Sequence, residues 1–259
     1  MTPADVLILG CGFTGRRIAA RLLARGVRVT ATTREPERLS GLGATVITMG
    51  EVREHLRPGT LVVHSIPPDG HVDPQELLGE APARVVYLSS TAVYGEATVV
   101  DADTPVDGST ERARVRLEEE GKVGAGPWSS LILRPAAIYG PGRGVQESFR
   151  RGAYLAGDNY VSRIHVDDLA AHLEAGLFSD LTGAFPVADE EPCTSREIAE
   201  FCARLLELPF PGPSVAGRAT GNRRVDGSAI RRALGIELRY PSYRVGIPAS
   251  LAGQEAYPT

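Results

Sequence analysis

The chain has 259 residues, of which 42% are hydrophobic, and its formal net charge at pH 7 is −4. This length is enough for one α/β domain with a small appended lobe, and the acidic balance argues against a general nucleic-acid-binding protein. No stretch approaches the roughly 20 apolar residues of a membrane span. The three cysteines form no disulfide framework, and the five histidines lack metal-ligand spacing. We therefore expect a cytoplasmic protein with no metal, no nucleic-acid partner and no membrane partner.

A glycine-rich turn near the amino end carries the strongest functional signal. The apolar run at residues 6–9 predicts a buried parallel strand, and Gly10, Gly12 and Gly15 follow it at G-x-G-x-x-G spacing. In this motif the first glycine permits a tight turn, the second lets a pyrophosphate approach the backbone, and the third lets the next helix pack closely. The helix predicted from Phe13 would direct unpaired N–H groups toward the phosphates.

A second strand, predicted for residues 27–32, completes the βαβ unit that this motif requires. In an NAD site, an acidic residue about 20 positions after the glycines usually binds the ribose hydroxyls. This chain has Thr33 and Arg34 there, and these groups suit the 2′-phosphate of NADP, which a carboxylate would repel. We therefore predict an NADP site, with NAD as the alternative cofactor and a solvated loop arginine as the alternative interpretation of Arg34.

The remaining apolar runs alternate with helical segments. Further strands are predicted at 44–49, 61–66, 85–89 and 131–133, and helices at 74–78, 109–121, 167–177 and 196–206. Alternating β and α elements predict a doubly wound parallel sheet, the Rossmann fold, with ligands at the carboxyl ends of the strands. We place a dinucleotide-binding domain at residues 1–187 and a smaller carboxyl-terminal substrate lobe at residues 188–259.

Five sequence blocks carry a resemblance to a known family. They are the glycine loop 10–15, the segment Y-L-S-S-T-A-V-Y-G at 87–95, L-R-P-A-A-I-Y-G-P-G at 133–142, R-I-H-V-D-D-L-A at 163–170 and V-A-D-E-E-P at 187–192. In this order and spacing the chain resembles the extended short-chain dehydrogenases/reductases, the group that contains nucleotide-sugar epimerases and dehydratases. It is most similar to the short, atypical members. The resemblance implies a Rossmann fold and an NAD(P) cofactor.

The resemblance also implies a catalytic group made of a Ser or Thr, a Tyr and a Lys. Ser90 lies where the family has its catalytic hydroxyl, four residues before a tyrosine. The Tyr-x-x-x-Lys pair is absent from the sequence, because Lys122 is the only lysine and Glu118 precedes it by four residues. A tyrosine needs such a lysine, since its unperturbed pKa is about 10.

Two registers are open for the residues that replace this pair. The first puts Thr110 at the tyrosine position and Arg114 at the lysine position, with Glu118 as the acid that often follows. The second puts Arg112 and Arg116 at the two positions. An arginine could bind the ribose and supply a fixed positive charge, but it donates no proton near neutral pH, and a threonine hydroxyl is too weak an acid.

Further polar residues near the blocks complete the set of candidates. Four additional cofactor contacts are expected at Phe13, Thr14, Ser65 and Pro135. Residues that we interpret first as packing or capping groups are Tyr94, Tyr139, His64, His165, Asp167 and Asp168. Residues 189–191 are interpreted as a solvated turn. Five arginines could bind a phosphate-bearing substrate or only form a basic surface, namely Arg218, Arg223, Arg224, Arg231 and Arg232.

Two hypotheses for the function follow. The first is an NAD(P)-dependent epimerase/dehydratase-like oxidoreductase that acts on a carbonyl or hydroxyl substrate, with a sugar nucleotide as one candidate. The second is a non-catalytic NADP(H)-binding sensor or partner-binding module that keeps the glycine loop but has lost the proton-transfer pair. The fold alone cannot decide between them, because function depends on the site. A monomer and a homodimer are both compatible with the sequence.

Overall fold

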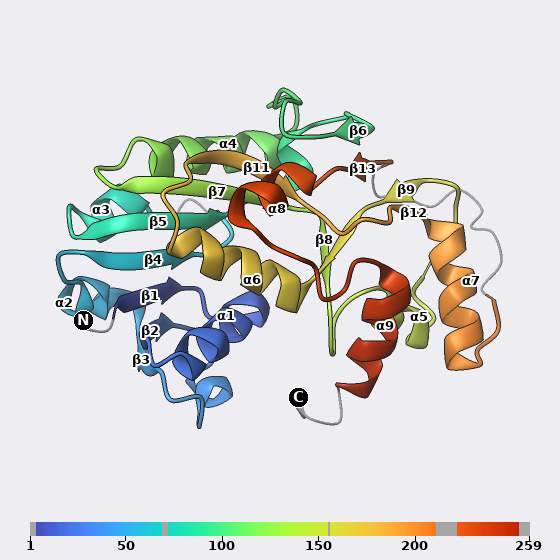
Figure 1. Ribbon diagram of the computed structural model, residues 1–259, viewed down its shortest axis with the longest axis horizontal. Helices are drawn as coiled ribbons and strands as arrows, with labels where there is room; N and C mark the ends of the chain where they lie inside the picture. Colours follow the sequence, from blue (N-terminus) through green and yellow to red (C-terminus); the bar gives the residue numbers. More distant parts are fainter. Residues whose placement is uncertain (1–3, 69–71, 155, 211–221, 254–259) are drawn as a thin grey trace.

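Seven parallel strands form the central sheet of the computed structural model, which describes residues 4–68, 72–154, 156–210 and 222–253 (Figure 1). The strand order is β11-β7-β5-β4-β1-β2-β3. The order reverses between β1 and β4, where such sheets bind ligands at their carboxyl ends. The strands are β1 (Asp5–Leu9), β2 (Arg28–Thr32), β3 (Thr45–Ile47), β4 (Thr60–His64), β5 (Pro82–Leu88), β7 (Ser129–Pro135) and β11 (Gly183–Val187).

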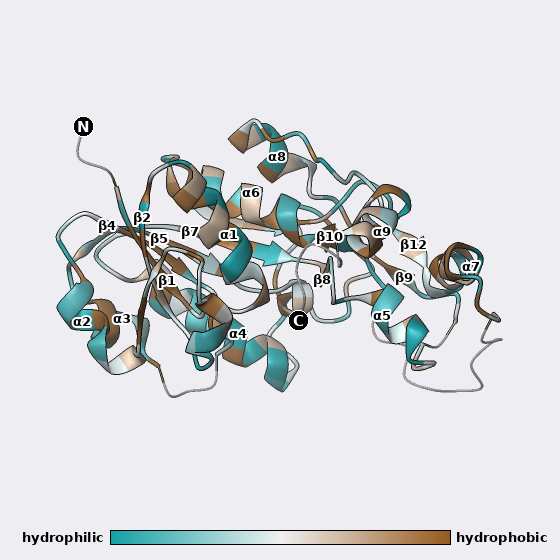
Figure 2. Cartoon of the chain, turned by 90° about the horizontal axis from the view of Figure 1, so that it is seen from below, coloured by the Kyte–Doolittle hydropathy of each residue, from teal (hydrophilic) through white to brown (hydrophobic). Residues whose placement is uncertain are grey.

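Helices cover both faces of the sheet, as a parallel sheet buried on both sides requires (Figure 2). One face packs against α1 (Phe13–Ala24), α6 (Val166–Leu177) and α8 (Ser228–Leu234). The other face packs against α2 (Val52–His55), α3 (Pro74–Leu78) and α4 (Glu111–Gly124). The doubly wound α/β architecture predicted from the sequence is therefore confirmed.

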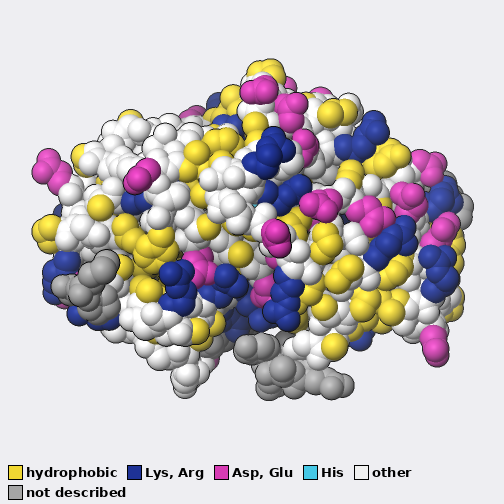
Figure 3. All heavy atoms as spheres, in the orientation of Figure 1, with side chains coloured by type: hydrophobic (Ala, Val, Ile, Leu, Met, Phe, Trp, Pro, Cys, Tyr) yellow, Lys and Arg dark blue, Asp and Glu magenta, His cyan; other side chains and the backbone are white. Residues whose placement is uncertain are grey.

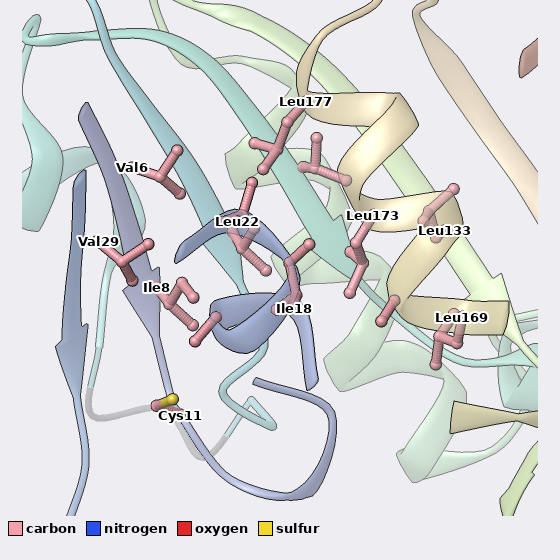
Figure 4. Close-up of a cluster of buried hydrophobic side chains, with 14 of the residues drawn as sticks. Val6, Ile8, Cys11, Ile18, Leu22, Val29, Leu133, Leu169, Leu173 and Leu177 are labelled. Carbon is pink, nitrogen blue, oxygen red and sulfur yellow. The ribbon is translucent and has the colours of Figure 1, made fainter. Parts of the chain in front are cut away.

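The larger core lies between β1, α1 and α6 (Figure 4). Ile18 and Leu22 of α1 meet Leu169 and Leu173 of α6, and all four side chains are fully buried. Burying a side chain of this size stabilises the fold by about 1.5–3 kcal/mol relative to leaving it exposed. This packing holds the start of α1, and with it the glycine loop, against the carboxyl end of β1.

A second lobe has its own hydrophobic cluster, built by α5 (Val145–Arg150), α7 (Ser195–Leu206) and α9 (Tyr243–Ala252). Thr194 caps α7 and exchanges hydrogen bonds with Glu197, which confirms the predicted start of that helix. Short strand pairs join the lobe to the sheet domain: β8 (Ala137–Tyr139) with β10 (Arg163–His165), β9 (Tyr160–Val161) with β12 (Cys193–Thr194), and β6 (Val99–Val100) with β13 (Arg224–Val225). Because α6 and β11 separate α5 from α7, and α8 separates α7 from α9, the lobe is assembled from three stretches of sequence.

Several elements were not predicted from the sequence, among them β11, α8 and α9. The strand β11 was not predicted, since Pro186 and a starting glycine weaken its strand pattern, yet it pairs with β7 at the sheet edge. Helices α8 and α9 lie in a stretch where we predicted no helix, and α9 contains Pro248. Within the described residues, no helix is long and apolar enough to cross a membrane.

Candidate functional site

The glycine loop follows β1 and turns sharply into α1. Gly10 adopts φ +85°, a left-handed conformation that side chains disfavour. Its N–H donates to Thr32 Oγ1 at 2.9 Å, and the Cys11 N–H donates to the Thr32 carbonyl at 2.7 Å. The Ser65 hydroxyl donates to the Gly10 carbonyl at 2.7 Å. Residues at the ends of β2 and β4 therefore fix the loop in place.

The other two glycines have different neighbours. A Cβ built on Gly15 would lie 2.7 Å from the Gly10 carbonyl oxygen, so any side chain there would collide with the turn. A Cβ built on Gly12 meets no atom within 4 Å, and Gly12 is exposed. The protein itself therefore leaves space at Gly12, beside the N-terminus of the twelve-residue helix α1. This space suits a pyrophosphate, which backbone N–H groups and the helix dipole would bind.

The end of β2 supplies positive charge beside the loop. Arg34 is exposed and has no ion pair to any residue of the described ranges, whereas the Thr33 hydroxyl accepts a hydrogen bond from the Glu35 N–H at 3.1 Å. Burial raises the pKa of the Cys11 thiol to about 11, and the nearby charge of Arg16 opposes that rise. Arg16, which the sequence did not single out, therefore lies close to the loop. On the face shown in Figure 3, basic side chains gather around α1.

The remaining predicted cofactor contacts lie on the same side of the sheet as the glycine loop. Thr14 is buried in the first turn of α1, and Phe13 is half-buried with the Arg143 guanidinium 5.1 Å from its ring centroid. Ser90 directly follows Ser89 at the end of β5, and its hydroxyl accepts a hydrogen bond from the Ala92 N–H at 3.2 Å. Pro135 is the last residue of β7. Because β4, β5 and β7 are neighbours in a parallel sheet, these residues share its carboxyl edge.

A buried polar network joins α4 to the strands beside this edge. Glu120 binds Arg134 of β7 through two hydrogen bonds, of 3.1 and 2.7 Å. The Ser89 hydroxyl donates to Glu120 Oε1 at 2.5 Å, and Arg134 donates to the Tyr94 hydroxyl at 3.2 Å. Two-bonded Arg–carboxylate pairs fix geometry as well as charge. The network therefore fixes the position of α4 relative to β5 and β7.

A second contact of α4 lies one strand further along the sheet. Glu119 Oε1 is 2.8 Å from His64 Nε2, and both side chains are buried. The His64 ring lies 4.9 Å from the ring of Tyr87, centroid to centroid. Burial raises the pKa of Tyr87, and the charge of Arg116 opposes that rise. Arg116 therefore lies near the Tyr87 hydroxyl, which has no hydrogen-bond partner of ordinary geometry among the described residues.

Comparison with known proteins places the chain in a family. Protein YeeZ of Escherichia coli K12 is 30% identical over 264 residues, which cover 91% of this chain and 96% of YeeZ. A structure from Methylobacillus flagellatus, assigned to the NAD-dependent epimerases/dehydratases, is 26% identical with a TM-score of 0.80, and the match covers 98% of this chain and 100% of that one. The chain is an extended short-chain dehydrogenase/reductase. No protein-family model matches it.

A Streptomyces relative also spans nearly the whole chain. The 3-diazoavenalumate denitrifying reductase is 26% identical over 300 residues, which cover 93% of this chain and 98% of the relative. Both curated relatives and the solved structure therefore match along the sheet domain and the second lobe together. The resemblance drawn from the five sequence blocks is confirmed at the level of the extended short-chain dehydrogenase/reductase family.

The structure bears on which α4 residues replace the family's Tyr–Lys pair. Thr110 is exposed and caps α4 by accepting a hydrogen bond from the Ala113 N–H at 3.1 Å, and Arg114 is exposed and paired with Glu111. Arg116, in contrast, lies near Tyr87 at the end of β5. The buried acid of the helix is Glu120, four residues after Arg116. Arg112, the other residue of the second register, is exposed like Thr110 and Arg114, so both registers stay as predictions.

The other side chains that could donate a proton in place of the missing tyrosine are buried. Tyr94 and Tyr139 are each 1% exposed, and burial raises the pKa of both hydroxyls. The Tyr139 hydroxyl lies against Gly246 of α9, where any side chain would collide with it. His165 caps α6 by accepting from the Asp167 N–H at 3.2 Å, and burial lowers its pKa to about 4. The interpretation of these groups as packing or capping residues fits their environments.

Two other expectations for acidic residues were wrong. Asp168 does not cap α6; its carboxylate accepts hydrogen bonds from the Arg239 and Tyr240 N–H groups, both at 2.9 Å, and so anchors the segment before α9. Asp189 is not solvated but 2% exposed, and the loop after β11 is held by hydrogen bonds from the Asp189 N–H to the Arg163 carbonyl at 2.7 Å and from the Glu190 N–H to the Pro241 carbonyl at 2.9 Å. Neither Asp189 carboxylate oxygen has a hydrogen-bond partner within the described ranges. Burial raises its pKa to about 8.

Most of the five arginines considered for phosphate binding have structural roles. Arg223 donates to the carbonyls of Thr91, Gly95 and Ala97, and Arg231 donates to the Ala188 carbonyl at 2.9 Å. The remaining three are Arg232, which donates to Ser228, Arg224, which lies over the Tyr160 ring, and Arg218, which is outside the described residues. The guanidinium groups of Arg223 and Arg231 thus already donate to backbone carbonyls, and Arg231 also pairs with Glu190.

A surface hollow of about 420 Å³ lies at the opposite end of the sheet. It is lined by the first residues of β1, β2 and β4, including Asp5, Arg28 and Thr60. Arg28 is already paired with Asp5 by two hydrogen bonds, of 2.6 and 3.0 Å. Ligands of doubly wound sheets bind at the carboxyl ends, so we assign the candidate site to the carboxyl edge of the sheet, beside the glycine loop.

Proposed function

We propose that the protein is an NADP(H)-dependent oxidoreductase that transfers hydride between the cofactor and a carbonyl or hydroxyl substrate. The open space at Gly12, beside the start of α1, carries this proposal. The space at Gly12 leaves room for a pyrophosphate, and the positive φ of Gly10 and the close contact at Gly15 supply the tight turn and the close helix packing of the same motif. The family membership and the reductase named among the relatives support the same class of reaction.

The predicted site residues have distinct proposed roles. Gly10, Gly12 and Gly15, with Phe13 and Thr14, would hold the pyrophosphate at the start of α1. Ser65 would act through the Gly10 carbonyl that it binds, and Pro135 and Ser90 would line the nicotinamide side of the site. When bound, the nicotinamide supplies the hydride chemistry, while this chain supplies position and charge.

The preference for NADP is proposed from charge at the end of β2. Arg34 and Arg16 lie beside the loop, with the Thr33 hydroxyl next to Arg34. A phosphate would receive charge-assisted hydrogen bonds from these guanidinium groups. NAD remains the alternative cofactor, and a sugar nucleotide remains one candidate substrate.

The deciding experiment combines binding and turnover. Purified protein is titrated with NADPH and NADH by fluorescence, and then mixed with NADPH and a panel of ketones, aldehydes, keto acids and sugar nucleotides while absorbance is followed. We expect tighter binding of NADPH and oxidation with at least one class of acceptor. Absence of binding by either cofactor would overturn the proposal. Binding without turnover on any acceptor would favour the second hypothesis, a non-catalytic NADP(H)-binding sensor or partner-binding module.

A further inference from the structure

Arg143 lies against the first residue of α1, although it belongs to the loop between β8 and α5. Its guanidinium carbon is 5.1 Å from the centroid of the Phe13 ring. A Cβ built on Gly140 would lie 3.3 Å from Cζ of the same ring, so the loop passes directly beside Phe13. Phe13 follows Gly12, the glycine at which the protein leaves open space. Because α5 is part of the second lobe, a positive charge from that lobe reaches the start of α1.

The turn that carries Arg143 is fixed by hydrogen bonds. The Arg143 N–H donates to the Gly140 carbonyl at 3.1 Å, and the Gly140 N–H donates to the Arg143 carbonyl at 2.9 Å. Gln146, which is fully buried, donates through Nε2 to the same two carbonyls, at 2.8 and 3.0 Å. Gly142 and Gly144 adopt φ +75° and +123°, which side chains disfavour. The backbone on which the Arg143 side chain stands is therefore held from inside the protein.

The Arg143 guanidinium has no polar partner of its own. Within the described ranges it donates no hydrogen bond and lies at ion-pair distance from no carboxylate, and the side chain is exposed. By contrast, Arg17 of α1 pairs with Asp167 at 3.6 Å, so the acid at the start of α6 already has a counter-charge. Contact with the ring of Phe13 holds a guanidinium in place while its N–H donors stay available. Such a group is ready to bind an anion beside the glycine loop.

We propose that Arg143 binds the pyrophosphate of the cofactor, together with the N–H groups at the start of α1. The inference rests on the proposed function, and it adds a residue of the second lobe to a site whose predicted residues all belong to the sheet domain. A guanidinium binds phosphate oxygens through paired N–H donors and stays charged at all relevant pH values. NAD and NADP share the pyrophosphate, so Arg143 would raise the affinity for both and leave the choice between them to Arg34.

The test measures dissociation constants of the full chain by calorimetry, at an ionic strength of about 0.15 M, where charges more than about 8 Å apart are largely screened. The ligands are NADP⁺, NAD⁺ and ADP-ribose, which has the pyrophosphate but no nicotinamide. In Arg143→Gln the affinity for all three should fall about tenfold or more, the loss of one charge-assisted contact. The ratio of the NADP⁺ and NAD⁺ affinities should stay as in wild type.

Arg151→Gln is the matched control, because it removes the same charge from an exposed arginine at the other end of α5, and it should bind like wild type. Arg143→Lys, which keeps a positive charge, should lose less affinity than Arg143→Gln. Melting temperatures check that the variants are folded, and they should change little because Arg143 is exposed.

The result for Arg143→Gln separates this inference from the proposed function. If wild type binds the cofactors and Arg143→Gln binds them equally well, the inference is overturned and the proposed function stands. A loss for NADP⁺ alone would assign Arg143 to the 2′-phosphate, and an equal loss in the Arg151 control would reduce its effect to general surface charge; either result overturns the inference. Absence of dinucleotide binding by wild type would overturn the proposed function, and this inference with it.

Discussion

Glu120 of α4 and Arg134 of β7 form a buried, two-bonded ion pair, with side chains only 6% and 11% exposed. Ser89 and Tyr94 complete the pair by hydrogen bonding to its two members. The pair thus connects the helix that carries Arg112 and Arg116 to the carboxyl edge of the sheet. Its integrity should matter both for the stability of the fold and for the placement of that helix.

Glu120→Ala should lower the free energy of unfolding by about 3–5 kcal/mol, because it leaves the Arg134 guanidinium buried without its counter-charge. Urea denaturation at neutral pH measures this change. Glu118→Ala is the control, since Glu118 is exposed on the same helix, and its effect should stay within about 0.5 kcal/mol. Equal effects of the two substitutions would show that the buried pair has no special role.

Gly12→Val should abolish NADP(H) binding while the protein remains folded. The new side chain meets no protein atom but would occupy the space proposed for the pyrophosphate. Gly15→Val should instead lower the melting temperature, since its Cβ would lie 2.7 Å from the Gly10 carbonyl oxygen. Cofactor titration and thermal melts of both variants make the comparison. Undiminished NADPH affinity in folded Gly12→Val would remove the basis of the cofactor site.

Arg34→Ala should erase most of the preference for NADP over NAD. One charge-assisted contact with the 2′-phosphate contributes about 1.5–3 kcal/mol, or roughly ten- to a hundred-fold in affinity. Binding of NAD should change little, because it has no 2′-phosphate. Dissociation constants for NADP⁺, NADPH, NAD⁺ and NADH, in wild type and variant, measure this preference. Equal wild-type affinity for NADP and NAD would contradict the prediction.

Asp189→Asn should stabilise the protein more at pH 8 than at pH 5. Burial raises the folded-state pKa of Asp189 to about 8, so the folded protein binds a proton that the unfolded chain has lost above about pH 4. Wild-type stability from this group is therefore present at low pH and declines as pH rises from about 4 to about 8. The asparagine variant, which cannot ionise, should lack this decline. Denaturation curves at several pH values measure the free energy of unfolding of both proteins. The same pH dependence in wild type and variant would contradict the assignment.

Installing a Tyr–Lys pair should raise reductase activity in one register only. Arg112→Tyr with Arg116→Lys places the pair on the α4 face that carries the contacts to Tyr87 and His64. General acid–base help typically contributes about 10²–10⁴-fold, which sets the scale of the gain on a neutral ketone. Thr110→Tyr with Arg114→Lys, on the exposed side, should give none. Steady-state assays with NADPH measure the activity of both double variants. A gain only in Thr110→Tyr with Arg114→Lys would favour the first register, in which Thr110 and Arg114 replace the pair.

Much of the fold was predictable because its signals are local. The glycine spacing, the apolar runs of β1 to β5 and the start of α7 each depend on residues that are close in sequence, and the structure confirms them. The weak patterns of β11, α8 and α9 gave no such signal. These elements form because the sheet edge and the second lobe offer apolar surface that they cover.

The sequence by itself determined the family and the glycine loop, and it singled out Arg34 after the second strand. Only the tertiary structure decided which face of α4 meets the sheet, because that choice depends on His64, Ser89 and Arg134, which are distant in sequence. The same holds for the burial of Asp189, a residue of a polar turn whose backbone bonds to the distant Arg163. A helix rich in both Arg and Glu offers several similar polar faces, and contacts with remote strands select one of them.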